Sequence, residues 1–312
     1  ANPTERKLIT EYVGLLQSEK KVAEARAVLD RALSQAPEAA DIHATMANFL
    51  LWQARDARSE LSAEEYAGLL DEAVKHSVEA TRLSPGMFQA YIAQVQAELM
   101  RDAREANAPI PRERYETALR ICEHALQSTV GIQSIDAWRG ARLYQEALLH
   151  IQAFNTAVQY LVSPGQAADR EQRLEWVRKF REAIEARYPD QAFTWYVRGL
   201  AHMTENDAGN AIQAFENAKR IEQANPRVAL YLWHHGFNGI LPVHRLAMLY
   251  RQLNEPGIAL NLTEEALQRY AQLYPGQAPP MELCISRAEL LGTLNRSQDA
   301  LDYIQELRHE YA

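Results

Sequence analysis

The sequence predicts an all-α solenoid made of antiparallel helix hairpins. Residues that favour helices, chiefly Ala, Leu, Glu, Gln and Arg, outnumber strand formers along the 312-residue chain. Small and aromatic residues recur three or four positions apart, which places them on one face of a helix. Polar turns and prolines interrupt these stretches repeatedly, as they do where helices end. Together these observations predict about seven hairpins, each packing a small-residue face against its neighbour.

The first two hairpins are defined by how their helices begin and end. Pro37 closes the first hairpin, because proline cannot continue a helix. Asp41 is the expected N-cap of the next helix, since its carboxylate could accept a hydrogen bond from the first turn. Ser62 followed by Glu65 matches a capping box, so the extra residues 55–68 are predicted to be lengthened helices with a fresh start at Ser62, and not an inserted domain.

The third and fourth hairpins are less regular. Pro109 and Pro111 enforce an extended connection inside the third hairpin. The Ser-Pro-Gly run at 163–165 is a stop inside the fourth, and Pro189 ends its return helix.

The fifth hairpin is the most regular. Its two helices are separated by a polar turn at 205–207, and Pro226 follows the second helix. The residues that define its packing face are Trp195, Gly199, Ala211, Phe215 and Ala218. The small members of this set are expected to let the two helices approach closely.

The sixth and seventh hairpins complete the chain. The short apolar segment Val228–Gly239 precedes the first helix of the sixth hairpin. Polar turns are predicted at 253–257 and 295–296, and the polar end 307–312 suits a solvent-facing terminal cap. The predicted hairpins span 4–37, 41–85, 87–130, 134–189, 191–226, 228–275 and 280–312, so that a single repeat domain covers 1–312.

The spacing of Trp195, Gly199, Ala211, Phe215 and Ala218 resembles the tetratricopeptide repeat, whose pattern W-x2-L-G-x2-Y…A-x3-F…P spans roughly 34 residues. The other hairpins are similar to this unit but stretched. The resemblance implies a right-handed superhelix whose first helices line a concave groove. It also implies a non-catalytic interaction scaffold that binds a peptide or protein partner in that groove.

The resemblance further implies which side chains of the fifth and sixth hairpins face the groove. They are Phe193, Tyr196, Leu200, Met203, His244, Met248 and Arg251. Aromatic and methionine side chains offer apolar contact area of adaptable shape, and Arg251 could pair with a carboxylate. The alternative is that these side chains pack against the neighbouring helix or against Val228–Trp233.

One subclass of the family grips a terminal carboxylate with Lys, Asn and Arg on successive first helices. Thr10 and Ala44 stand at the corresponding places here, and only Asn48 fits, so the resemblance does not extend to this clamp. His234, His235 and His244 do not predict a metal site, because adjacent histidines point to different faces of a helix and no carboxylate or cysteine completes the set.

Composition argues against several other classes of protein. The net charge of −8 and the pI near 5.7 disfavour nucleic-acid binding, and the basic cluster at 178–181 is interleaved with glutamates. No apolar run reaches the roughly 20 residues needed for membrane insertion. Cys122 and Cys284 lie far apart among apolar neighbours, which predicts two buried free thiols.

No catalytic motif or cofactor is predicted, because neither a phosphate-cradling glycine loop nor a G-x-S-x-G sequence is present. Two alternatives to the scaffold remain. One is an α/α-toroid glycoside-type enzyme, which would need two carboxylates facing one cavity. The other is homo-oligomerisation through the apolar segment Val228–Leu241 or an uncapped end of the array. The cytoplasm is the favoured compartment, with the periplasm open if a leader or anchor has been removed.

Overall fold

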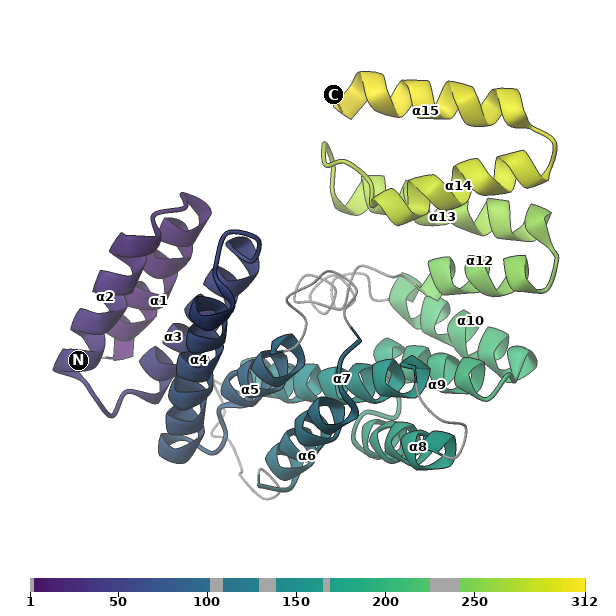
Figure 1. The fold of residues 1–312 in the computed structure, drawn as a ribbon. Coiled ribbons are helices and arrows are strands. Elements are labelled where there is room, and N and C mark those ends of the chain that lie inside the picture. The colour runs from purple at the N-terminus through teal and green to yellow at the C-terminus, as the bar shows by residue number, and fades with distance from the viewer. Residues whose placement is uncertain (1–2, 102–108, 129–138, 165–168, 225–241, 312) are drawn as a thin grey trace. The chain divides into compact units, whose positions relative to one another are not determined.

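A computed structural model describes residues 3–101, 109–128, 139–164, 169–224 and 242–311, and the regular structure in these ranges is helical throughout (Figure 1). The described residues contain fourteen helices, which form seven consecutive hairpins. The all-α hairpin-repeat class predicted from the sequence is therefore confirmed. The hairpins are α1 (Pro3–Ser18) with α2 (Val22–Gln35), α3 (Ala40–Asp56) with α4 (Ala63–Leu83), α5 (Phe88–Met100) with α6 (Arg112–Ser128), α7 (Arg139–Val162) with α8 (Arg170–Arg187), α9 (Ala192–Thr204) with α10 (Ala208–Ala224), α12 (Pro242–Gln252) with α13 (Pro256–Leu273), and α14 (Met281–Thr293) with α15 (Ser297–Tyr311).

The chain divides into two compact units, Ala1–Phe180 and Arg181–Ala312, and α8 contributes residues to both. In the first unit, the first helices of successive hairpins contact one another, α1 with α3, α3 with α5 and α5 with α7. Each second helix also packs against the next first helix, as α2 does against α3. In the second unit, α10 packs against α12 and α13 against α14. This nearest-neighbour packing is how hairpin repeats bury an apolar face that one hairpin cannot bury alone.

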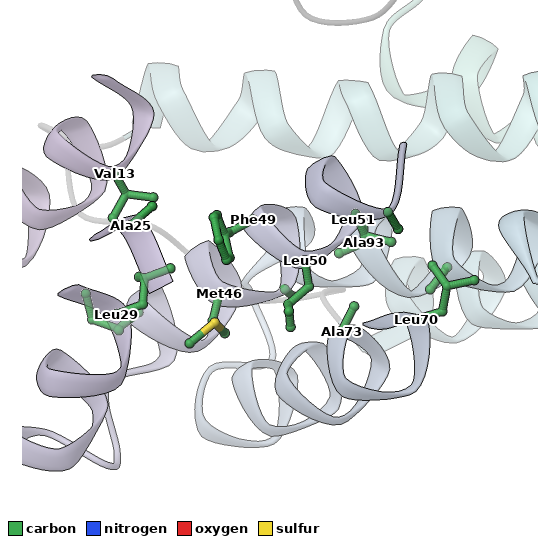
Figure 2. Packing of buried hydrophobic residues seen from close by; sticks show 14 of the residues in the cluster. Val13, Ala25, Leu29, Met46, Phe49, Leu50, Leu51, Leu70, Ala73 and Ala93 are labelled. Carbon is green, nitrogen blue, oxygen red and sulfur yellow. The ribbon is translucent and has the colours of Figure 1, made fainter. Parts of the chain in front are cut away.

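One buried apolar cluster of the first unit extends over helices α1 to α5. Figure 2 shows Leu29 of α2 close to Met46 of α3, while Leu70 and Ala73 of α4 lie near Ala93 of α5. All five side chains are almost completely buried. The cluster combines small residues such as Ala73 and Ala93 with large ones such as Leu29 and Met46.

Gly199 sets the approach of α9 to α10. A Cβ at this position would lie 2.6 Å from Cε1 of Phe215, whose side chain is completely buried. No real Cβ contact is that short, so the backbone of α9 can reach this ring only because residue 199 has no side chain. The close approach expected from the sequence is confirmed.

Four of the turns inside hairpins share one backbone geometry. Each places a residue in the left-handed region, with φ of 57° at Lys20, 60° at Asn206, 61° at Asn254 and 58° at Asn295. At the third of these turns, the Glu255 N–H donates to the Tyr250 carbonyl at 2.9 Å, and equivalent bonds of 2.9 Å recur at the other three. This is a Schellman C-cap. Asparagine adopts the left-handed backbone conformation of this cap more readily than most other residues do.

Of the two predicted helix starts, the one at Ser62 is confirmed and the one at Asp41 is wrong. At Ser62, the hydroxyl oxygen accepts from the Glu65 N–H at 3.2 Å and the Glu65 carboxylate accepts from the Ser62 N–H at 2.8 Å, so the capping box is confirmed. The N-cap prediction for Asp41 is wrong, because α3 starts at Ala40 and Asp41 lies in its first turn. There its carboxylate accepts from Arg6 at 3.2 Å and stabilises the positive end of the helix dipole.

The two cysteines are buried and free, as predicted. Burial in α6 raises the pKa of the Cys122 thiol to about 12, which keeps it protonated and unreactive at neutral pH.

A pair of histidines joins α3 to α4. His43 Nε2 lies 2.9 Å from the Pro37 carbonyl oxygen, which can only accept, so His43 Nε2 carries the proton. His43 Nδ1 must then accept from His76 Nδ1, 2.8 Å away. Protonating both rings would set two N–H donors against each other, so this geometry holds at most one positive charge. Burial and the neighbouring His43 lower the pKa of His76, although Glu72 at 3.8 Å opposes that shift.

Replacing Gly199 with Ala should lower the free energy of unfolding by about 2 kcal/mol, because the methyl group overlaps the ring of Phe215. Gly14→Ala in the interior of α1 is the matched control, since nothing lies within 4 Å of its added Cβ. That control should raise stability by roughly 0.5–1 kcal/mol. Urea unfolding of both variants measures the difference, and equal effects would contradict the account of Gly199.

Acidification should destabilise the protein partly through His76. Its folded pKa lies below the unfolded value of about 6.5, so the unfolded state binds protons first and stability falls as the pH drops below that value. In His76→Asn, whose amide still offers an N–H to His43, the fall in unfolding free energy between pH 7 and pH 5 should be smaller. Denaturant unfolding at the two pH values measures it, with the exposed His309→Asn as control. If His76→Asn leaves the pH dependence of the unfolding free energy unchanged, His76 does not cause the loss of stability in acid.

Candidate functional site

The predicted groove residues lie on α9 and α12 of the second unit and differ in accessibility. Phe193, Tyr196 and His244 are buried, whereas Leu200, Met203 and Met248 are partly exposed and Arg251 is exposed. We define the first-helix strip as Leu200, Met203, Arg245, Met248 and Arg251. The segment Val228–Trp233, the alternative packing partner, lies outside the described residues.

The buried aromatic residues pack inside their own part of the repeat. The Phe193 ring meets the Tyr188 ring edge-on at a centroid distance of 5.2 Å. The Tyr196 ring lies 5.6 Å from that of Phe215, so it rests on the side chain that Gly199 admits. The role of these two rings in binding a partner stays a prediction.

Arg245 connects α9 to α12. Its Nε donates to the Tyr196 hydroxyl oxygen at 3.2 Å, and its Nη1 lies 3.8 Å from the Met248 sulfur. Burial raises the pKa of Tyr196, so the hydroxyl stays protonated and accepts from the guanidinium as a neutral group. Both contacts are to neutral groups and leave most of the guanidinium donors uncommitted.

The charge of Arg245 is not matched within the described part of the chain. No carboxylate there lies within ion-pair distance of Arg245, whereas Arg198 pairs with Glu185 at 2.9 Å. Arg251, further along α12, pairs with Glu289 of α14 at 2.7 Å. Within the described residues the hydrogen-bond contacts of the Arg245 guanidinium therefore go only to the Tyr196 hydroxyl and the Met248 sulfur.

His244 lies next to Arg245 at the start of α12 and is buried. Its Nδ1 has no hydrogen-bond partner among the residues that the structure describes. Burial, followed by the charge of Arg245, lowers the pKa of His244, so the imidazole is neutral at neutral pH. A buried polar atom without a partner is rare, and it marks this position as one where a ligand group could complete the bonding.

The strip places hydrogen-bond donors beside apolar surface. Arg245 supplies fixed donors, and the methionines beside it supply polarisable apolar surface. No group of three or more His, Cys, Asp or Glu residues in the described ranges is arranged to hold a metal ion. His234 and His235 lie outside those ranges. At the positions compared with the carboxylate clamp, the Asn48 amide donates to the Ala44 carbonyl of its own helix at 3.0 Å.

Sequence reasoning missed Arg245. Its spacing of three from Met248 predicts that the two share a face of α12, and this contact could have been expected. The hydrogen bond between Arg245 and Tyr196 could not have been expected from the sequence, because 49 residues separate the two partners.

The chain has no match among protein-family models or among curated proteins. Among solved structures it is similar to the assembly chaperone of RpL4 (Acl4), with a TM-score of 0.52 and 15% identity over 95% of this chain and 99% of that one. A chain of the APC/C hetero-tetramer Cut9-Hcn1 matches with a TM-score of 0.49 and 12% identity over 97% of this chain but 46% of that one. A thermophilic TPR protein from Thermus thermophilus matches with a TM-score of 0.38 and 14% identity over 92% and 98% of the two chains. The likeness to Acl4 shows a shared fold, and the tetratricopeptide-like resemblance is confirmed at that level.

Removing the Tyr196 hydroxyl should loosen Arg245 while leaving the ring packing intact. Tyr196→Phe is expected to lower the unfolding free energy by about 1 kcal/mol, since it deletes a hydrogen bond from a charged donor at a partly buried position. Thermal or urea unfolding checks this value. Phe193→Leu, which changes a neighbouring ring but no hydrogen bond to Arg245, is the comparison. If Tyr196→Phe proves as stable as the parent protein, the hydrogen bond from Arg245 to Tyr196 contributes nothing to stability and does not hold Arg245 in the first-helix strip.

Proposed function

We propose that this chain is a non-catalytic scaffold that binds a peptide or protein segment along the first-helix strip of its second unit. The observation that carries the proposal is Arg245, which is held by Tyr196 and Met248 but has no carboxylate partner in the described residues. A partner segment that offers an acidic side chain or a main-chain carbonyl would satisfy it. Met203 and Met248 would cover an apolar neighbour on the same segment.

Two further observations favour a protein partner. Acl4, which shares the fold, is an assembly chaperone of the protein RpL4. By contrast, the basic cluster at 178–181 is neutralised internally, since Arg178 pairs with Glu171 at 2.7 Å and Lys179 pairs with Glu123. A nucleic acid would find few free cations there. None of the described helices has the length and apolar character needed to span a bilayer.

The α/α-toroid alternative gains no support from the cleft beside α13. An inverting or retaining glycoside mechanism needs two carboxylates roughly 5–10 Å apart across one cavity. The cleft is lined by one carboxylate, that of Glu264, which accepts from Arg287 at 3.2 Å. We therefore favour binding over catalysis.

Self-association is a second candidate, and a specific observation favours it. Leu8, Tyr12 and Leu15 form an exposed stripe on α1 at a helical spacing of four and three. On α15, Leu301 and Ile304 are exposed, in the helix whose polar end 307–312 was predicted to suit a solvent-facing terminal cap of the array. The other predicted surface, Val228–Leu241, lies outside the described residues. Light scattering over a range of concentrations tests this candidate, and a strict monomer would eliminate it.

The strip is tested by capturing a partner with the full chain and then measuring its affinity for variants. Arg245→Gln should weaken binding about tenfold or more, because it removes a charged hydrogen-bond donor from the interface. Arg220→Gln, which removes the same charge from the exposed face of α10, is the matched control and should bind like the parent chain. The double variant Met203→Ala, Met248→Ala should also bind more weakly. Equal affinities for Arg245→Gln and the parent chain, with the fold intact by circular dichroism, would rule the strip out.

A further inference from the structure

Met248 lies beside Arg245 on the first-helix strip. Its sulfur is 3.8 Å from Arg245 Nη1, and its side chain is partly exposed. A thioether sulfur is only a weak hydrogen-bond acceptor. The sulfur therefore lies next to a charged donor without binding that donor strongly.

This neighbour distinguishes Met248 from the other methionines. The chain contains six methionines, at positions 46, 87, 100, 203, 248 and 281. Within the described ranges, Met248 has the one methionine sulfur that lies within hydrogen-bond distance of a side-chain donor. Met46 is completely buried, whereas Met281 is 72% exposed. Exposure alone therefore does not set Met248 apart, but its cationic neighbour does.

A partly exposed methionine reacts with peroxides that reach its sulfur. A sulfur lone pair attacks one oxygen of hydrogen peroxide, so that the S–O bond forms as the O–O bond breaks and the second oxygen leaves as hydroxide. The proton that remains on the transferred oxygen combines with this hydroxide to give water. The sulfur loses two electrons to the peroxide, and the product is methionine sulfoxide.

The sulfoxide offers Arg245 a different bond from the one that the thioether offers. Its oxygen carries partial negative charge, and the side chain becomes polar. An N–H···O hydrogen bond spans about 2.9 Å. An oxygen on the side of the sulfur that faces Nη1 shortens the 3.8 Å separation toward that length. The positive charge of the donor strengthens such a bond.

Arg245 has donors left for this new bond. Its Nε donates to the Tyr196 hydroxyl at 3.2 Å, and within the described residues the contact to the Met248 sulfur is the one hydrogen-bond contact of its Nη groups. A guanidinium carries five N–H donors. An acceptor at Nη1 therefore does not require the bond to Tyr196 to break.

We propose that Met248 is a site of reversible oxidation whose sulfoxide is bound by Arg245. Oxidation replaces a weak contact with a charge-assisted hydrogen bond inside α12 and withdraws the guanidinium from other acceptors. If a partner binds Arg245, which rests on the proposed function, oxidation of Met248 weakens that binding. Methionine sulfoxide reductases reverse the change.

The test uses the full chain without a partner and measures the reaction of Arg245 with phenylglyoxal, which modifies accessible guanidinium groups. Peptide mass spectrometry before and after treatment with hydrogen peroxide measures both the sulfoxide at Met248 and the label at Arg245. Labelling of Arg245 should fall about threefold or more once Met248 is oxidised, because a charge-assisted hydrogen bond then competes with the reagent. A mixture of the two reductases, one for each sulfoxide epimer, should restore the labelling.

Two controls locate the effect. Arg220, on the exposed face of α10, should be labelled equally before and after the peroxide treatment. Met248→Leu has nearly the same volume and no sulfur to oxidise, so peroxide should leave the labelling of Arg245 in this variant unchanged. Circular dichroism checks that the variant keeps its fold.

Three results would overturn the proposal. One is unchanged labelling of Arg245 in a chain that carries the sulfoxide at Met248. Another is an equal fall in Met248→Leu, which would assign the effect to a different methionine. The third is the absence of sulfoxide at Met248 after a treatment that oxidises Met281 completely. Because no partner takes part, a failure here is distinct from a failure of the proposed function, which the affinity of Arg245→Gln decides.

Discussion

The contact between Gly199 and the ring of Phe215 is the constraint on which the second unit depends. It sets how closely α9 and α10 approach, and it provides the buried ring against which Tyr196 packs at 5.6 Å. Tyr196 in turn holds Arg245 of the next hairpin through its hydroxyl group. The absence of a side chain at Gly199 in one hairpin therefore affects, through Phe215 and Tyr196, the position of the Arg245 guanidinium in the next hairpin.

The repeat architecture could be predicted from the sequence because it depends on residues that lie close together in the chain. Residues three and four apart, such as Ala211, Phe215 and Ala218, reveal a helix face without knowledge of the partner helix. The Ser62–Glu65 capping box is likewise contained in four residues. The Asp41 prediction failed because the N-cap of α3 is Ala39, two residues before Asp41. The carboxylate of Asp41 instead binds Arg6 of the preceding hairpin, a contact that local spacing does not reveal.

The candidate site depends on a pair that the sequence does not connect. Nothing in the spacing of the chain joins Arg245 to Tyr196. Phe193, Tyr196 and His244, which the resemblance places in the groove, are buried, whereas Met203 and Met248 are partly exposed and Arg251 is exposed. The role of either set in binding a partner stays a prediction.

The proposed partner segment lies on the first helices of the second unit and engages Arg245. Hydrogen–deuterium exchange of the full chain, with and without a captured partner, is the decisive measurement. Slowed exchange on binding should be concentrated in α9 and α12, around residues 200–204 and 245–252, and absent from α10. Protection confined to other helices, with exchange in α9 and α12 unchanged, would contradict it.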